Sequence, residues 1–145
     1  MASILLIDDD ENLRVITDEM LRAAGHTVDT AGDGKAGLEL YKATLHGLVI
    51  TDIVMPDMDG LELIDKLRQT EPRPRVIAMS DGHRFSKPVY LPTAKRLGAE
   101  RTLAKPVRPD VLLQIVADVL SEPPPATLRH VVATEGAIAT TPSKP

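Results

Sequence analysis

The sequence LVITDIVMPDMDG occupies residues 48–60. It begins with a short apolar run, Leu48–Thr51, in which β-branched residues predominate, and this composition predicts a strand buried on both faces. Asp52 ends the run, and the loop after it leads into a helix whose inner face carries Leu61, Ile64 and Leu67. A buried strand, a carboxylate at its end and a following helix together indicate an α/β fold.

The same alternation of short apolar runs and helical periodicity continues on both sides of this stretch. We expect strands at Ser3–Ile7, Thr27–Ala31, Leu48–Thr51, Arg75–Met79 and Arg101–Ala104. We expect helices between Asp10 and Gly25, from Gly34 to about Ala43, after Gly60, from about Tyr90 to Leu97 and from Pro109 onward. Parallel neighbouring strands need crossover connections, which are right-handed. The alternation therefore predicts an α/β fold, a doubly wound five-stranded parallel sheet with five helices.

Expectations for individual side chains follow from the same pattern. The first helix is predicted from apolar and small residues that recur at helical spacing: Leu13, Ile16, Thr17, Met20, Leu21 and Ala24. The histidines, by contrast, are scattered over turns, a loop and the end of the chain: His26, His46, His83 and His130. We expect them to be solvated rather than catalytic.

The overall composition excludes several classes of function. The 145 residues include no cysteine, which rules out disulfides, thiolate metal sites and thiol nucleophiles and suits a reducing compartment. The 17 basic and 21 acidic residues give a formal charge of −4, and no basic cluster stands out that would neutralise a nucleic-acid backbone. The apolar run near the amino terminus stops at three carboxylates, too early for a signal peptide or a membrane span. We expect a cytoplasmic protein with no direct nucleic-acid or membrane contact.

Polar residues stand at the carboxyl ends of four of the predicted strands. They are Asp8 and Asp9, Asp52, Ser80 and Lys105. In a doubly wound sheet these ends meet at one edge, and ligands bind beyond it where the strand order reverses. Three carboxylates without histidine form a hard-oxygen site that suits Mg²⁺ or Mn²⁺. A further carboxylate oxygen can act as a phosphoryl-accepting nucleophile, with a lysine and a hydroxyl group to hold the phosphoryl oxygens.

Four segments at these strand ends resemble the signature segments of one family. They are ILLIDDDENLR at residues 4–14, LVITDIVMPDMDG at 48–60, VIAMS at 76–80 and TLAKP at 102–106. In this order they are similar to the receiver domain of two-component response regulators, and in particular to single-domain members like the chemotaxis regulators. The resemblance covers about residues 1–120, and it implies the flavodoxin-like α/β fold with strand order 2-1-3-4-5. Residues 121–145, rich in Pro, Thr and Ala, are then expected to be a tail with no output domain.

The resemblance implies a role for each residue of the constellation. Asp52 would be the phosphoacceptor; Asp9, Asp52 and the backbone carbonyl of Val54 would bind the Mg²⁺ (or Mn²⁺) cofactor directly, and Asp8 through water; Ser80 and Lys105 would bind the phosphoryl group; Pro106 would follow a cis peptide bond. The domain would catalyse only its own phosphorylation and dephosphorylation, and would not otherwise be an enzyme. A sensor histidine kinase or a histidine phosphotransfer protein would donate the phosphoryl group. The signal would pass to an unidentified downstream protein through the fourth strand, the fourth helix and the fifth strand.

The sequence departs from the family pattern around that surface. Asp81 stands where a small residue usually follows the hydroxyl residue, and its charge near a site for a dianion is expected to slow phosphorylation. Thr102 replaces the usual aromatic switch residue, so a different readout is needed. Val54 and Gly82 flank the site and are expected to tune the lifetime of the phosphoryl group.

Two other functions stay open at this point. Asp8-x-Asp10 after an apolar strand is similar to the nucleophile motif of haloacid-dehalogenase-type phosphatases, in which Asp8 would be the nucleophile, although Asn12 stands where that motif expects Thr or Val. Alternatively, the chain is a receiver-fold binding module that is not phosphorylated. A separate hypothesis concerns the tail, in which Leu128, Val131 and Val132 are apolar enough to dock on a neighbouring chain, as in a homodimer.

Overall fold

The computed structural model describes residues 2–81 and 89–125, and strands alternate with helices throughout these ranges. The strands are β1 (Ser3–Ile7), β2 (Thr27–Ala31), β3 (Leu48–Asp52), β4 (Arg75–Asp81) and β5 (Arg101–Lys105). All of their pairings are parallel, in the order β2-β1-β3-β4-β5. This arrangement confirms the predicted doubly wound sheet of order 2-1-3-4-5.

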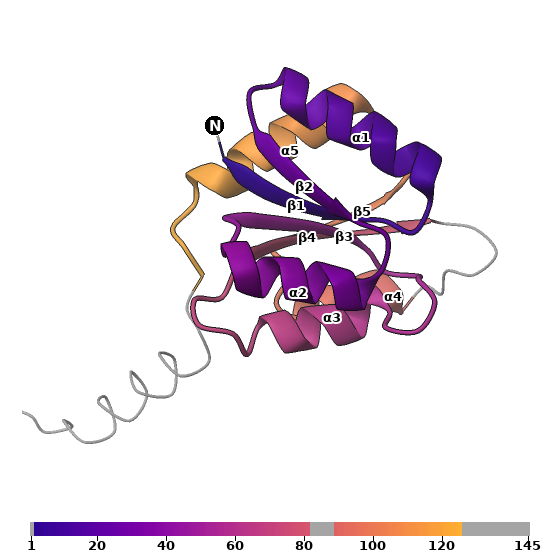
Figure 1. Cartoon of the computed structure of the whole chain (residues 1–145), viewed down its shortest axis with the longest axis vertical. Helices are drawn as coiled ribbons and strands as arrows, with labels where there is room; N and C mark the ends of the chain where they lie inside the picture. The colour runs from indigo at the N-terminus through magenta and orange to yellow at the C-terminus, as the bar shows by residue number, and fades with distance from the viewer. Residues whose placement is uncertain (1, 82–88, 126–145) are drawn as a thin grey trace, which may run out of the picture.

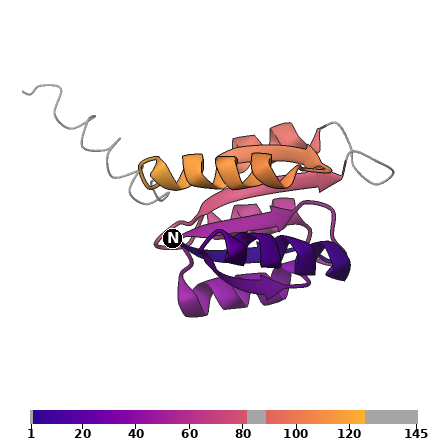
Figure 2. The ribbon, with the colours of Figure 1, turned by 90° about the horizontal axis from the view of Figure 1, so that it is seen from above.

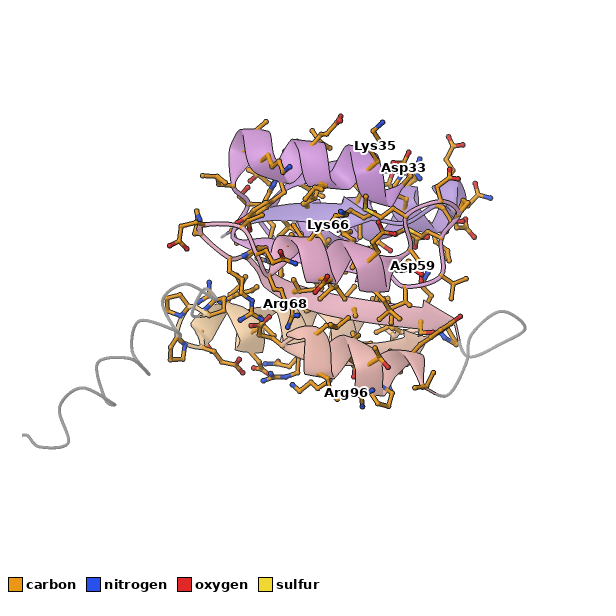
Figure 3. All side chains as sticks on the ribbon, turned by 90° about the horizontal axis from the view of Figure 1, so that it is seen from below. Asp33, Lys35, Asp59, Lys66, Arg68 and Arg96 are labelled. Carbon is orange, nitrogen blue, oxygen red and sulfur yellow. The ribbon has the colours of Figure 1, made fainter. Side chains whose placement is uncertain are left out.

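Most of the helices begin at a residue suited to a helix start. The helices are α1 (Glu11–Ala23), α2 (Gly34–Thr44), α3 (Gly60–Leu67), α4 (Tyr90–Leu97) and α5 (Pro109–Ser121). The carboxylates of Asp10, Asp33 and Asp59 cap the first three by accepting a hydrogen bond from a backbone N–H three residues later; Figure 3 shows Asp33 and Asp59 in place. Pro109 opens α5, where its missing N–H is not needed. Among the described residues, no helix is both long enough and apolar enough to cross a membrane.

The helices cover both faces of the sheet (Figures 1 and 2). α1 and α5 lie on one face, and α2, α3 and α4 lie on the other. Alternation of side chains along each strand separates the two cores: Ile4 and Leu6 of β1 belong to the core beneath α1 and α5, whereas Leu5 and Ile7 belong to the core beneath the other helices. The strands are therefore buried on both faces, as is usual for a parallel sheet with crossover helices.

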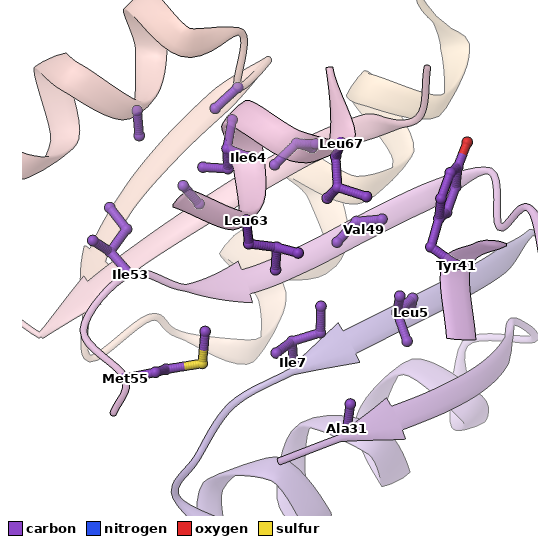
Figure 4. Close-up of a cluster of buried hydrophobic side chains, with 14 residues drawn as sticks. Leu5, Ile7, Ala31, Tyr41, Val49, Ile53, Met55, Leu63, Ile64 and Leu67 are labelled. Carbon is purple, nitrogen blue, oxygen red and sulfur yellow. The ribbon is translucent and has the colours of Figure 1, made fainter. Parts of the chain in front are cut away.

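The core beneath α2, α3 and α4 is a cluster of closely packed apolar side chains (Figure 4). α3 contributes Leu63, Ile64 and Leu67, all buried. Tyr41 of α2 lies in the same cluster, and its hydroxyl donates a hydrogen bond of 2.6 Å to the carbonyl of Pro72. The Glu71–Pro72 peptide bond is cis, a feature that the sequence analysis did not predict.

β4 is longer than its apolar run indicated. The hydropathy pattern predicted Arg75–Met79, but the pairing continues, with Ser80 opposite Ala104 and Asp81 opposite Lys105 of β5. Backbone hydrogen bonds do not depend on the polarity of the side chains, so a strand can extend beyond the apolar residues that reveal it. Ser80 therefore lies within the strand rather than in the loop after it.

The apolar stripe of α1 is only partly covered by the sheet. Leu21 is fully buried, but Leu13 and Ile16 are 42% and 59% exposed. The first half of the helix borders a groove between α1 and the β5–α5 loop, with Leu13 and Thr17 in the wall. An apolar stripe at helical spacing shows that a helix is amphipathic, but it does not show which neighbour covers each residue.

His46 is buried, contrary to the prediction that the histidines are solvated. It lies just before β3, and its Nε2 atom is 2.7 Å from Oδ2 of Asp29 in β2. Its Nδ1 atom is buried without a hydrogen-bond partner among the described residues. The sequence carried no signal for this pair because its members are 17 positions apart. Several residues of the sequence analysis lie outside the described ranges: Gly82, His83, Leu128, His130, Val131 and Val132.

The unequal burial of the helices leads to a test by two matched truncations. Leu63→Ala removes a fully buried side chain and should lower the free energy of unfolding by about 2–5 kcal/mol. Ile16→Ala removes an equally large but exposed side chain and should change this free energy by less than about 0.5 kcal/mol. Urea denaturation followed by far-ultraviolet circular dichroism measures both, since the chain has no tryptophan. A loss of about 2 kcal/mol or more in Ile16→Ala would contradict the exposed position of α1.

Candidate functional site

The carboxyl ends of β1, β3, β4 and β5 lie at one edge of the sheet. Asp8 follows β1, Asp52 is the last residue of β3 and Lys105 is the last residue of β5. Ser80 lies in β4, and Asp81 after it pairs in register with Lys105. The parallel register thus places at a single edge the polar residues that the sequence analysis found at four separate strand ends.

Three carboxylates form the centre of this edge. One oxygen from each of Asp8, Asp9 and Asp52 lies within 4.8 Å of the other two. Asp8 and Asp52 are buried, with 2% and 6% of their surface exposed, whereas Asp9 is exposed. A donor set made of carboxylate oxygens fits Mg²⁺ or Mn²⁺, which prefer hard oxygen ligands. The grouping of these three side chains therefore matches the expected cation site.

Lys105 partly neutralises the two buried carboxylates. Its Nζ atom lies 3.0 Å from Oδ2 of Asp8 and 3.4 Å from Oδ2 of Asp52. Two carboxylates held close together repel each other more strongly in a poorly hydrated setting than in water. The ammonium group reduces this repulsion. Because it is a point charge on a flexible stem, it can also follow a newly added anion.

Burial and charge shift the protonation of both partners in this ion pair. Burial raises the pKa of the Asp52 carboxyl from 3.8 to about 6; the charge of Lys105 opposes this shift, and the charges of Asp8 and Asp9 add to it. Burial acts to lower the pKa of Lys105, but the carboxylates of Asp52 and Asp8 outweigh it, so that pKa is raised. At neutral pH, Lys105 is therefore charged, and Asp52 is ionised but close to the pH at which it takes up a proton.

The backbone of Asp52 packs tightly against the start of α3. The N–H of Gly60 donates a hydrogen bond of 2.7 Å to the carbonyl of Ile53. A Cβ atom on Gly60 would collide with the carbonyl oxygen of Asp52, so this approach requires glycine. The Asp52 side chain is also tied locally, because its Oδ1 accepts a hydrogen bond of 3.0 Å from the N–H of Ile53. Gly60 thus fixes how the end of the β3–α3 loop and the start of α3 pack against Asp52.

Comparison with known proteins identifies this arrangement. Residues 4–117 match the family model of the response regulator receiver domain. The chain belongs to this family. Among solved structures, the chemotaxis protein CheY4 of Vibrio cholerae aligns with a TM-score of 0.75 at 28% identity, over 82% of this chain and 98% of that one. A CheY-like receiver domain protein of Methanospirillum hungatei aligns with a TM-score of 0.77 at 28% identity, over 83% and 94%.

The curated relatives of this receiver domain are longer proteins. The DNA-binding transcriptional regulator NtrC of Azospirillum brasilense is 36% identical over 131 residues, which are 88% of this chain and 26% of NtrC. The transcriptional regulatory protein GlrR of Escherichia coli is 33% identical over 126 residues, which are 87% of this chain and 28% of GlrR. The chain thus spans little more than a quarter of the length of these two relatives. The similarity therefore supports a receiver domain in this chain. The activities of the full-length relatives are properties of those proteins.

Other predicted residues of the receiver domain lie at the same edge. Val54 is half-buried in the β3–α3 loop, two residues after Asp52. Ser80 is buried in β4. The Lys105–Pro106 peptide bond is cis, the form that the resemblance implies. These positions are compatible with the expected roles of Val54 in cation binding and of Ser80 in phosphoryl binding, both of which stay predictions.

The residues expected to tune the receiver domain are described less fully. Thr102 is half-buried in β5 and pairs in register with Ala78 of β4. Asp81 is the last residue of β4, but its side chain lies outside what the structure describes, as does Gly82. The tuning roles of Asp81, Gly82 and Thr102 therefore stay predictions.

Sequence reasoning missed Arg14, which contacts the site from α1. Its Nη1 atom donates a hydrogen bond of 2.6 Å to the backbone carbonyl of Asp8. Arg14 closes the segment ILLIDDDENLR, yet the sequence analysis gave it no role, because a contact between a side chain and a backbone carbonyl leaves no pattern in hydropathy or charge. The only available signal was its position in the first turn and a half of the helix that follows the acidic residues.

An apolar groove opens next to the carboxylates. Its volume is about 280 Å³, and it is lined by Asp8, Leu13, Thr17, Met20, Met79, Lys105, Pro106, Val107 and Leu112. The lining comes from α1, the end of β4, the β5–α5 loop and α5, with Asp8 and Lys105 joining it to the site. The receiver domain therefore presents an apolar surface directly beside its charged centre.

The raised pKa of Asp52 predicts how the stability of the domain depends on pH in the absence of divalent cations. A raised pKa means that the folded protein binds this proton more tightly than the unfolded chain does. Proton binding at Asp52 therefore stabilises the folded state. This stabilisation is complete below about pH 4 and is lost as the pH rises through about 6. Asp52→Asn, which cannot ionise, should therefore be more stable than the wild type by about 1–3 kcal/mol at about pH 7.5, with a smaller difference at about pH 4.

Urea denaturation at the two pH values measures this difference. Asp57→Asn is the matched control, because Asp57 lies in the same loop, is exposed and has the left-handed backbone (φ 64°) that asparagine tolerates. An equal gain in stability for Asp52→Asn at both pH values would show that the effect does not come from ionisation.

Proposed function

We propose that Asp52 accepts a phosphoryl group from a phosphohistidine donor and that the transfer depends on Mg²⁺. The position of Asp52 carries this proposal: its buried carboxylate lies within 4.8 Å of those of Asp8 and Asp9 and 3.4 Å from the ammonium group of Lys105. Catalysis of phosphoryl transfer consists mostly of positioning and of stabilising charge. A carboxylate next to two potential cation ligands and a lysine is both positioned and surrounded by groups that can stabilise charge. Membership of the receiver family supports the same conclusion.

In the proposed transfer, an oxygen of Asp52 attacks the phosphorus atom. A P–O bond forms while the P–N bond to the donor imidazole breaks, and the imidazole nitrogen keeps the electron pair of that bond. Lys105 turns towards the oxygens of the phosphoryl group, and the hydroxyl of Ser80 donates a hydrogen bond to another of them. Water later hydrolyses the acyl phosphate. The domain thus catalyses only its own phosphorylation and dephosphorylation and has no separate substrate to turn over.

In this proposal the three carboxylates would hold the cation. Asp9, Asp52 and the carbonyl of Val54 would bind it directly, and Asp8 would bind it through water. When bound, Mg²⁺ or Mn²⁺ supplies positive charge that offsets the charge of the phosphoryl oxygens. Oδ2 of Asp8 already faces Lys105, which is consistent with a less direct part for Asp8.

The proposed donor is a sensor histidine kinase or a histidine phosphotransfer protein, and the signal passes on to a downstream protein. The exposed apolar residues of α1, Leu13, Val15 and Ile16, lie on the helix that borders the groove beside Asp8 and Lys105. Exposed apolar residues beside a charged groove support a contact with another protein here. We place the docking of the donor on α1 and the β5–α5 loop, and the exchange in the cytoplasm, whose reducing conditions suit a chain without cysteine.

Intact mass spectrometry tests the phosphoacceptor. After incubation with acetyl phosphate and Mg²⁺, the wild type should gain one phosphoryl group, about 80 Da, whereas Asp52→Asn should gain none. Removal of Mg²⁺ with a chelator should abolish the gain. Asp8→Asn should still allow it, at a lower rate, because Asp8 is not the nucleophile. Modification that persists in Asp52→Asn would overturn the proposal, and no modification of the wild type by acetyl phosphate or by phosphorylated histidine proteins would favour an unphosphorylated binding module.

Two charge substitutions test the docking surface. Ile16→Asp should slow phosphoryl transfer from a purified histidine kinase about tenfold or more, because in the complex with the kinase a charge would replace an apolar contact. It should leave the rate with acetyl phosphate unchanged. The kinase used is one from a panel that transfers to the wild type. Leu45→Asp is the matched control, since Leu45 is also a large exposed apolar residue but lies at the opposite end of β3 from Asp52. Equal slowing by both variants would contradict docking on α1.

A further inference from the structure

Each of the four polar atoms of Asp8 makes a hydrogen bond. Its N–H donates to the carbonyl of Ala31 at 3.1 Å, and its carbonyl accepts from Nη1 of Arg14 at 2.6 Å. Its Oδ1 accepts from the N–H of Asp10 at 3.0 Å, and its Oδ2 accepts from Lys105 at 3.0 Å. Of these partners, Arg14 brings a contact from within α1. The position of Asp8 is thus linked to the helix as well as to the sheet.

The side chain of Arg14 passes close to Gly32 on its way to Asp8. Its half-buried side chain runs from the second turn of α1 past Gly32, in the turn after β2. A Cβ atom on Gly32 would lie 3.2 Å from Nη1 of Arg14 and 3.7 Å from the central carbon of its guanidinium group. The guanidinium group therefore joins three segments: the start of α1, the end of β1 and the β2–α2 turn.

Asp9 depends on these neighbours for its own position. Its side chain is exposed, and it lies between Asp8, fixed by the contacts above, and Asp10, fixed as the cap of α1 through the N–H of Leu13 at 3.1 Å. The chain turns from strand to helix within these three residues. A contact that immobilises the Asp8 carbonyl therefore limits where the Asp9 carboxylate can lie relative to Asp52.

We propose that Arg14 is a positioning residue of the cation site, acting through the backbone of Asp8 without touching the ion. The inference rests on the proposed function, which places the cation among Asp8, Asp9 and Asp52. Residues that orient metal ligands from behind commonly change metal affinity tenfold or more when they are removed. The positive charge of Arg14 acts in the opposite sense, because it repels a cation. A test must separate these two effects.

Substitutions of Arg14 and of a second arginine of α1 make this separation. Arg14→Met removes both the charge and the donor, and Arg14→Lys keeps both with a different shape. Arg22→Met is the matched control: Arg22 also lies on α1 and donates to a backbone carbonyl of the sheet, that of Val28 at 2.5 Å. It also pairs with the carboxylate of Asp18 at 2.8 Å, but it lies in the last turn of α1, away from Asp8, Asp9 and Asp52. Gly32→Ala is a further variant that retains Arg14 and crowds its guanidinium group.

Calorimetric titration of the full chain with Mg²⁺ is the primary measurement, supported by the electron paramagnetic resonance signal of free Mn²⁺. Arg14→Met should raise the Kd for Mg²⁺ about tenfold, Arg14→Lys should raise it less, and Arg22→Met should leave it within about twofold of the wild type. Gly32→Ala should also raise the Kd for Mg²⁺. It therefore provides the test if Arg14→Met does not fold. With acetyl phosphate at saturating Mg²⁺, the maximal rate in Arg14→Met should approach that of the wild type.

Each alternative result has a definite meaning. An unchanged or lower Kd in Arg14→Met would show that charge repulsion equals or exceeds any positioning effect and would overturn the inference. An equal rise in Arg14→Met and Arg22→Met would assign the effect to general loosening of α1 and would also overturn it. Failure of the wild type itself to bind Mg²⁺ or to gain a phosphoryl group would count instead against the proposed function, so the two failures are distinguishable.

Discussion

The ammonium group of Lys105 lies between two buried carboxylates, and the geometry of the functional edge depends on that contact. Asp8 and Asp52 are both removed from water, and without a nearby cation their charges would repel each other. The three partners come from the ends of β1, β3 and β5, so they can meet only when the parallel sheet has formed with its strands in the observed order. The chemistry proposed for Asp52 therefore requires the whole sheet, although each residue taken alone is an ordinary strand-terminating polar group.

The two faces of the sheet serve this edge in different ways. Beneath α2, α3 and α4, an apolar core packs against β3 (Figure 4). At the start of α3, Gly60 lies tight against the backbone of Asp52. On the other face, α1 and α5 leave an open groove that reaches Asp8 and Lys105. One face thus supports Asp52, the proposed phosphoacceptor, while the other presents the apolar groove proposed here as a docking surface.

Prediction from sequence succeeded where the signal was local. Apolar runs ending in a polar residue located the strands, and Asp10 and Pro109 stand where the first and last helices were expected to begin. Prediction failed where a side chain depends on a distant partner. The burial of His46 beside Asp29 and the exposure of Ile16 on an apolar stripe are both consequences of which element lies opposite.

The site shows the same division. The carboxylates and Lys105 could be predicted because strand ends converge in a parallel sheet. The contact of Arg14 with a backbone carbonyl could not, since its partner is an atom that every residue possesses. Similarly, the extension of β4 to Asp81 follows from its pairing with β5 and not from the polarity of its own residues.

The sparse burial of α1 has a thermodynamic consequence. Over its 13 residues the helix buries one side chain, Leu21, so ordering its first half gains little from apolar packing. A cation held beside Asp9 and a protein bound over Ile16 would each restrict the same stretch of backbone, and whichever binds first bears the loss of conformational entropy for both. The two binding events are then positively coupled without any change of average structure, and the coupling would be visible as slower amide hydrogen exchange in α1.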